Sequence, residues 1–216
     1  MSRGCPGGPA ADRSFVGPGG PLAMSAIAID LQPDLALDDA TFARICRQNP
    51  HCKFERTAAE ELVIVALTGG GTGQRNSRLT ARLVLWNEET GLGEVFDSST
   101  GFKLPNGAIR SPDVAWVSRD RWLALSAKEQ DSYPPLCPDF VVELKSPSDD
   151  LGQVQAKMQE YLNNGLRLGW LLDPAEAIAQ IYRPDRPVET LKSPTTLSGD
   201  SCLPGFSLSL SGILDS

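Results

Sequence analysis

The sequence predicts an α/β domain, in which helices and strands alternate along the chain. The clearest stretch is a strand that contains Glu143, a helix with apolar residues every three or four positions, and a buried strand at residues 168–172. A second amphipathic helix is predicted at residues 75–87. With 216 residues, 41% of them hydrophobic and 22% charged, the chain has the size and balance of one soluble globular domain.

Residues 1–23 stand apart from the rest in composition. They contain six Gly and four Pro without a repeat, so they offer too little apolar surface to form a core. We predict a disordered head at residues 1–23 and a single domain at residues 24–216. The head lacks the continuous apolar core of a secretory signal. Met24 begins a stretch of ordinary composition, so translation from Met1 and from Met24 both remain open.

The first half of the chain contains one helix and two strands before the helix at residues 75–87. The helix is predicted at residues 38–47, where an aspartate can cap the first turn and an Asn-Pro pair follows the last. The short strands are predicted at residues 54–57 and 61–67. The glycine run at residues 69–73 is predicted to break the chain. No Gly-Lys-Ser or Gly-Lys-Thr follows it, so a nucleotide-binding loop is not indicated.

The second half of the chain is predicted to contain most of the strands, together with two helices. A Pro-Asn-Gly turn forms a hairpin that leads to Asp113, and Pro147 ends the strand that contains Glu143. Ser148 or Asp149 is predicted to cap the helix that follows. The remaining elements are a short helix at residues 120–128 and strands at residues 93–97, 101–104, 108–110, 113–117, 178–182 and 206–210, the last of them a half-buried edge strand.

Glu143 and Lys145 are the first candidate site residues. Side chains of a strand alternate between its faces, so these two residues share one face while Val142 and Leu144 point to the other. Asp113 opens a second apolar run, and its carboxylate can reach the same place if the two strands are neighbours. Two carboxylates and a lysine suit a divalent metal ion that activates water against a phosphodiester.

Structural interpretations of these residues also remain open. Asp113 could cap a turn after Pro112, and Glu143 and Lys145 could form an ion pair on an exposed strand. An exposed ion pair does not explain why apolar residues surround the two charges. Burying charges among apolar residues costs free energy unless the charges are paired or coordinated. Trp86, Trp116, Trp122 and Trp170 are interpreted as core or rim packing residues, with stacking on bases as the alternative. Arg75, Arg78 and Arg82 lie at helical spacing and are interpreted as a solvated helix face, with a local basic surface as the alternative.

Composition and charge exclude several classes of protein. The net charge of −7 disfavours nonspecific binding of polyanions. The one histidine, His51, cannot form a His-rich metal centre or a pair of acid and base histidines. The five cysteines are scattered and contain no Cys-x-x-Cys pair, which indicates a reducing cytoplasm. The longest apolar run, at residues 62–67, is too short to cross a membrane.

Four motifs in order along the chain carry a resemblance to a known family. They are Ser111-Pro112-Asp113, Pro138-Asp139-Phe140-Val141-Val142-Glu143, Ser146-Pro147-Ser148 and Gly169-Trp170-Leu171-Leu172-Asp173-Pro174. With them the chain resembles the PD-(D/E)XK nuclease superfamily and, within it, the putative restriction endonuclease family common in cyanobacteria. The likeness spans about residues 54–182, and residues 203–206 resemble that family's ending. The resemblance implies a restriction-endonuclease-like α/β/α core, with a mixed central sheet flanked by helices.

The resemblance also implies an activity and its residues. Asp113 and Glu143 would ligate Mg²⁺ or Mn²⁺ together with the carbonyl of Leu144. Lys145 would lie near the attacking water and stabilise the charge that develops on phosphorus. The expected protein is a metal-dependent endonuclease that hydrolyses DNA phosphodiester bonds. A homodimer would let two sites cut both strands.

Further residues are auxiliary candidates on the same resemblance. Asn76 stands where the family commonly has a histidine, and an asparagine can hydrogen-bond but cannot exchange protons. Lys157 and Tyr161 have the spacing of the Gln-x-x-x-Tyr of related nucleases, and Glu55 matches a Tyr-Glu that the family favours.

Two other functions are left open by the sequence. The acidic charge and the Asn76 substitution also suit an inactive interaction module that keeps the nuclease fold. The same site residues could serve a hydrolase of another phosphate ester.

Overall fold

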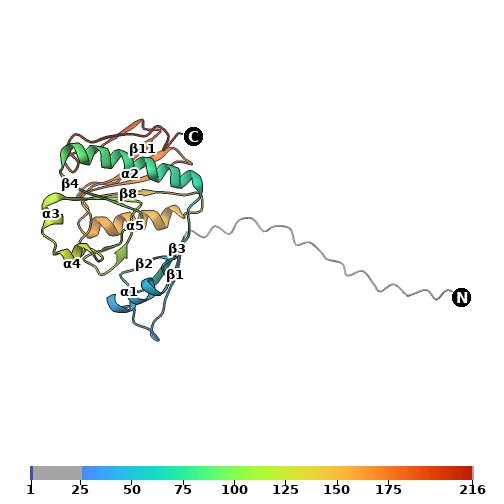
Figure 1. The fold of residues 1–216 in the computed structure, drawn as a ribbon. Helices are drawn as coiled ribbons and strands as arrows, with labels where there is room; N and C mark the ends of the chain where they lie inside the picture. Colours follow the sequence, from blue (N-terminus) through green and yellow to red (C-terminus); the bar gives the residue numbers. More distant parts are fainter. Residues whose placement is uncertain (2–25, 216) are drawn as a thin grey trace.

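A six-stranded mixed sheet forms the centre of the computed structural model (Figure 1). Its strand order is β11-β10-β9-β8-β7-β4, in which β8 and β9 run parallel and all other neighbours run antiparallel. The strands are β4 (Gly93–Asp97), β7 (Val114–Ser118), β8 (Phe140–Leu144), β9 (Leu168–Asp173), β10 (Ile178–Tyr182) and β11 (Glu189–Lys192).

The structure describes Met1 and residues 26–215. The disordered head predicted at residues 1–23, apart from Met1, and the alternative start at Met24 lie outside the described residues.

Two long helices cover opposite faces of the central sheet. Helix α2 (Gly70–Thr90) and helix α5 (Leu151–Asn163) lie on either side of β8 in Figure 1. The alternation of side chains along β8 explains this: Val142 packs in the cluster of α2, and Val141 packs in the cluster of α5. The predicted α/β/α core with a mixed central sheet is therefore confirmed.

A second, antiparallel sheet contributes residues to the site described below. Its strand order is β1-β3-β2-β6-β5, and α5 lies between it and the central sheet (Figure 1). Helix α1 (Asp39–Gln48) packs on β2 and is capped by the Asp38 side chain, as predicted. The strands are β1 (Ala26–Ile29), β2 (Lys53–Arg56), β3 (Leu62–Val65), β5 (Phe102–Lys103) and β6 (Ile109–Arg110).

The C-terminal segment packs against α2. Strands β12 (Thr196–Ser198) and β13 (Ser207–Ser209) form a two-stranded sheet of their own, so the predicted edge strand at residues 206–210 pairs there. Arg78 donates to the carbonyl of Gly212, 2.6 Å away, and Arg82 donates to the carbonyls of Ser209 and Ser211. These arginines therefore hold the C-terminal segment through contacts at the protein surface, and Arg78 is exposed there.

Three predicted boundaries are wrong. The glycine run does not break the chain, because α2 begins at Gly70. Residues 120–128 fall in two short helices, α3 (Arg119–Leu123) and α4 (Ala127–Gln130), because a capping box between Ser126 and Glu129 starts a new helix. Helix α5 is capped by Asp150, while Asp149 accepts a hydrogen bond from the amide of Ser146.

The helices in the described part of the chain do not combine the length and the apolar character that a membrane crossing requires.

Candidate active site

Asp113 and Glu143 come together at the same end of two neighbouring strands. In the antiparallel pair of β7 and β8, Val114 lies opposite Val142, so the next pair in this register is Asp113 and Glu143. The Asp113 carboxylate accepts hydrogen bonds from the Leu144 amide at 2.8 Å and from the Asn76 side chain at 2.9 Å. The Leu144 amide belongs to β8, so the backbone of one strand holds the carboxylate of the other.

Glu143 is buried and Asp113 is partly buried, and this changes the acidity of both carboxyl groups. Burial raises the pKa of Asp113 above its ordinary value, against the hydrogen bond from Leu144 and the charge of Lys157. Burial also raises the pKa of Glu143, to about 7, and the nearby Asp113 carboxylate adds to the increase while Lys157 opposes it. A cation placed between these carboxylates would relieve the electrostatic cost of ionising both of them.

Lys157 brings a positive charge to Glu143 from helix α5. Its ammonium lies 2.9 Å from a Glu143 oxygen and 3.0 Å from a Glu55 oxygen. Burial would lower the pKa of Lys157, but the two carboxylates outweigh it and raise that pKa. The Tyr161 hydroxyl, one turn further along α5, donates to the same Glu143 oxygen at 3.1 Å. The structure therefore brings Lys157 and Tyr161 to the Asp113 and Glu143 pair.

Lys145 has a different partner. It follows β8 directly, and its ammonium lies 3.5 Å from the carboxylate of Asp173 at the end of β9. The parallel register of β8 and β9 explains this pairing, because Leu144 lies opposite Leu172 and the next positions are Lys145 and Asp173. The lysine in contact with Glu143 is therefore Lys157.

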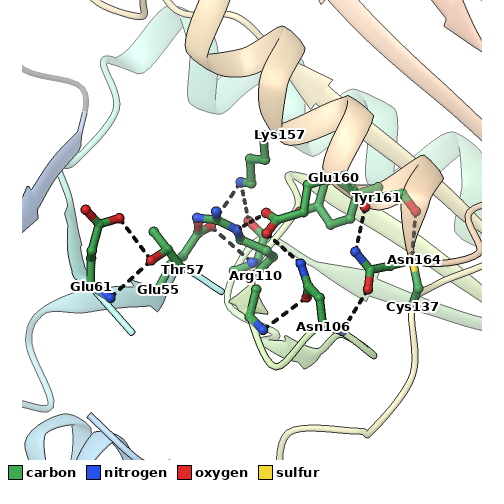
Figure 2. Close-up of polar contacts among 12 residues, drawn as sticks. Glu55, Thr57, Glu61, Asn106, Arg110, Cys137, Lys157, Glu160, Tyr161 and Asn164 are labelled. Carbon is green, nitrogen blue, oxygen red and sulfur yellow. Dashed lines mark hydrogen bonds and ion pairs between the residues drawn. The ribbon is translucent and has the colours of Figure 1, made fainter. Parts of the chain in front are cut away.

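Glu55 joins the second sheet to this site. Its carboxylate, on β2, accepts a hydrogen bond from the Ser111 amide at 3.0 Å and lies 3.3 Å from Arg110. Arg110 in turn contacts Glu160 of α5 at 2.5 Å, and Figure 2 shows these side chains gathered beneath the helix. Burial would raise the pKa of Glu55, but Lys157 and Arg110 outweigh it and hold that pKa below its usual range. Glu55 therefore shares the Lys157 ammonium with Glu143 and helps to fix it.

Sequence reasoning missed Lys53, Arg110 and Glu160. Lys53 precedes Glu55 by two residues on β2, so alternation places both on one face of the strand. The two-residue spacing of Lys53 and Glu55 could therefore have indicated Lys53 from the sequence. Arg110 and Glu160 are 50 residues apart and meet only through the packing of α5 on the second sheet, which no local pattern indicates.

The donor atoms around Asp113 fit a hard divalent cation. Among residues 26–215, no three His, Cys, Asp or Glu side chains gather closely enough to hold a metal. The buried side-chain oxygen of Asn76, next to Asp113, has no hydrogen-bond partner among these residues. The carboxylates of Asp113 and Glu143 and the free Oδ1 of Asn76 are hard oxygen donors, the kind that Mg²⁺ and Mn²⁺ prefer.

Comparisons with known proteins identify the family and the fold of the chain. A family model, Uma2, described as a putative restriction endonuclease, matches residues 39–211. A crystal structure of a putative nuclease belonging to DUF820 from Anabaena variabilis ATCC 29413 is similar in fold, with a TM-score of 0.64 and 17% identity. The similarity covers 74% of this chain and 89% of that chain. No curated protein matches the sequence. The chain belongs to the Uma2 family of putative restriction endonucleases.

Proposed function

We propose that this chain is an endonuclease that hydrolyses DNA phosphodiester bonds with Mg²⁺ or Mn²⁺. The observation that carries the proposal is the pairing of two carboxylates, the partly buried Asp113 and the buried Glu143, across β7 and β8, with the Lys157 ammonium on Glu143. The family match and the fold of the DUF820 structure support nuclease-like chemistry on this framework.

Asp113 and Glu143 would hold the ion, and the Leu144 carbonyl would join them as the family resemblance implies. When bound, the ion activates water and neutralises charge on the phosphate. The chain's own residues orient the carboxylates: the Leu144 amide and Asn76 hold Asp113, and Tyr161 holds Glu143. This fixed arrangement means that little reorganisation is needed when charge develops in the transition state.

In this proposal Lys157 takes the role that the family resemblance implies for Lys145. Its ammonium is already at the carboxylate pair, whereas the Lys145 ammonium is at Asp173. A positive charge beside Glu143 stabilises negative charge that develops on a phosphate bound there. We therefore expect Lys157→Gln to lower kcat far more than Lys145→Gln.

The test is cleavage of supercoiled and single-stranded DNA by the purified chain with Mg²⁺ or Mn²⁺. Asp113→Asn and Glu143→Gln keep the shape of each side chain, and each should abolish cleavage with an unchanged circular dichroism spectrum. Asp139→Asn is the matched control, because Asp139 is buried just before β8, at the other end of that strand. DNA that stays intact at every salt concentration would refute the proposal, as would cleavage that survives Asp113→Asn.

A noncatalytic module with this fold is the second candidate. It is favoured by the contact of Lys157 with Glu143, which supplies a positive charge without a metal ion. Isothermal titration calorimetry separates the two functions. A site with no measurable affinity for Mg²⁺ or Mn²⁺ cannot carry out metal-assisted hydrolysis.

A further inference from the structure

Lys53 is a cation of the site that has no fixed partner. Strand β2 places it on the same face as Glu55, whose carboxylate contacts Lys157 and the Ser111 amide. The charged groups that act on its ammonium are Lys157, Glu55, Glu143 and Asp113. Among residues 26–215, no carboxylate oxygen lies within 4.0 Å of this ammonium, although the side chain is half-buried.

The other two cations of the site are already committed to carboxylates. Lys157 contacts both Glu143 and Glu55, and Arg110 contacts both Glu55 and Glu160. A phosphate that contacted either cation directly would have to displace an ion pair and leave a buried carboxylate without compensation, so these two cations can act on it only through space. Lys53 can bind an anion without that cost.

The net charge of the site also indicates Lys53 as the residue that is free to bind an anion. With every group ionised, acidic side chains exceed basic ones by one: Glu55, Asp113, Glu143 and Glu160 against Lys53, Arg110 and Lys157. The site then has a net charge of −1. A divalent cation at Asp113 and Glu143 changes the net charge to +1, which the single negative charge of a phosphodiester would neutralise. The unpaired positive charge is then that of Lys53.

We propose that the ammonium of Lys53 binds the phosphodiester group that the Asp113 and Glu143 site hydrolyses. This assignment rests on the proposed nuclease function and goes beyond it by naming the group that holds the substrate. The flexible stem of a lysine lets its ammonium follow the phosphate, and its half-buried position strengthens a charged hydrogen bond. Lys53 is thus a phosphate-binding residue, separate from the groups that would hold the metal.

The experiment compares Lys53→Gln, Lys53→Arg and the control Lys103→Gln. Lys103 lies in the same sheet, on β5, and pairs with Asp39 away from the site. We expect Lys53→Gln to lower kcat/KM for a duplex DNA about tenfold or more, mainly through KM, since a charged hydrogen bond to the substrate is lost. The slope of log affinity against log salt should fall by about 0.9, the value for one phosphate contact. Lys53→Arg should restore most of kcat/KM and most of the salt slope. Lys103→Gln should have the wild-type values of both quantities.

Calorimetry with Mn²⁺ alone distinguishes the possible failures. Lys53→Gln should bind Mn²⁺ at least as tightly as wild type, because it removes a like charge from beside the site. Wild-type cleavage together with an unchanged KM and salt slope in Lys53→Gln would overturn this assignment and leave the nuclease proposal intact. A wild-type protein that neither binds Mn²⁺ nor cleaves DNA would overturn both.

Discussion

The ammonium of Lys157 holds two buried carboxylates, and its replacement by methionine tests how much the fold depends on it. The side chains of Glu143 and Glu55 are 9% and 5% exposed, and Lys157 contacts both within 3.0 Å. Methionine keeps a similar apolar stem but removes the charge. Removing one partner of a buried ion pair costs about 3–5 kcal/mol. We therefore expect Lys157→Met to lower the free energy of unfolding by about 3–5 kcal/mol at pH 8.

The loss should grow with pH because of Glu143. Burial raises the pKa of Glu143 from 4.5 to about 7, so its neutral form is favoured in the folded protein. This contribution to stability is complete below the unfolded pKa and is lost as the pH rises through 7, by about 3 kcal/mol in total. Lys157 holds this pKa down, so in Lys157→Met it lies higher and stability continues to fall above pH 7. The difference between the two proteins should therefore widen from pH 6 to pH 9.

The assay is urea unfolding of both proteins at several pH values across that range. Arg183→Met is the matched control, because Arg183 also contacts two carboxylates, Glu189 at 2.8 Å and Asp200 at 2.7 Å, but near the surface. Exposed pairs contribute about 0–1 kcal/mol, so the control should lose little at any of these pH values. A loss below about 1 kcal/mol in Lys157→Met at pH 8, or one equal to that of the control, would refute the reasoning.

Three other outcomes follow from the structure. The affinity for Mn²⁺, measured by calorimetry, should rise about tenfold from pH 6 to pH 8, because Glu143 with a pKa of about 7 must lose its proton to bind the ion; a flat profile would contradict this. Gly93→Ala should cost at least about 1–3 kcal/mol in urea unfolding, because a Cβ there would lie 2.2 Å from the Val117 carbonyl oxygen. Gly73→Ala should instead stabilise the protein by about 0.5–1 kcal/mol, because Gly73 lies inside α2 with open space around its Cβ position.

Most of the fold could be predicted from the sequence because its elements have strong local patterns. The apolar stripe of α5 and the continuous apolar runs of β8 and β9 indicate a strand, a helix and a strand without further information. The start of α2 could not be predicted, since four residues of poor helix propensity are helical there. They continue a helix whose later turns bury Leu79, Leu83 and Trp86, and that packing outweighs local propensity.

Short and weakly apolar strands were the other part of the fold that the sequence did not indicate. Strands β11 and β12 have three or four residues each, most of them exposed, so they lack a hydrophobic period. Their positions are set by pairing, β11 with β10 and β12 with β13. Pairing of this kind depends on tertiary structure and leaves little trace in the strand itself.

The candidate site could be predicted only where it depends on neighbouring strands. Asp113 and Glu143 lie opposite each other in the register of β7 and β8. The sequence predicts that the two carboxylates meet if their strands are neighbours, and the strands are neighbours. The contacts of the lysines could not be predicted in this way. A Glu-x-Lys spacing places both side chains on one face of β8, yet the ammonium of Lys145 extends to the next strand and Asp173. Register to the following strand, and not the spacing within the motif, decides which carboxylate a terminal lysine meets.

The position of Lys157 makes the second sheet part of the site. Because Lys157 contacts Glu55 of β2 as well as Glu143 of β8, the ammonium is fixed between two sheets by residues 102 and 14 positions away in sequence. A lysine on β8 would need only its own strand to be in place. Here the charge beside Glu143 depends on α5 packing against both sheets at once, and the Arg110–Glu160 ion pair is a second contact between α5 and the second sheet. Loss of the second sheet would therefore remove Glu55 and leave the ammonium paired with Glu143 alone, so Lys157 would be less firmly fixed even if the central sheet remained folded.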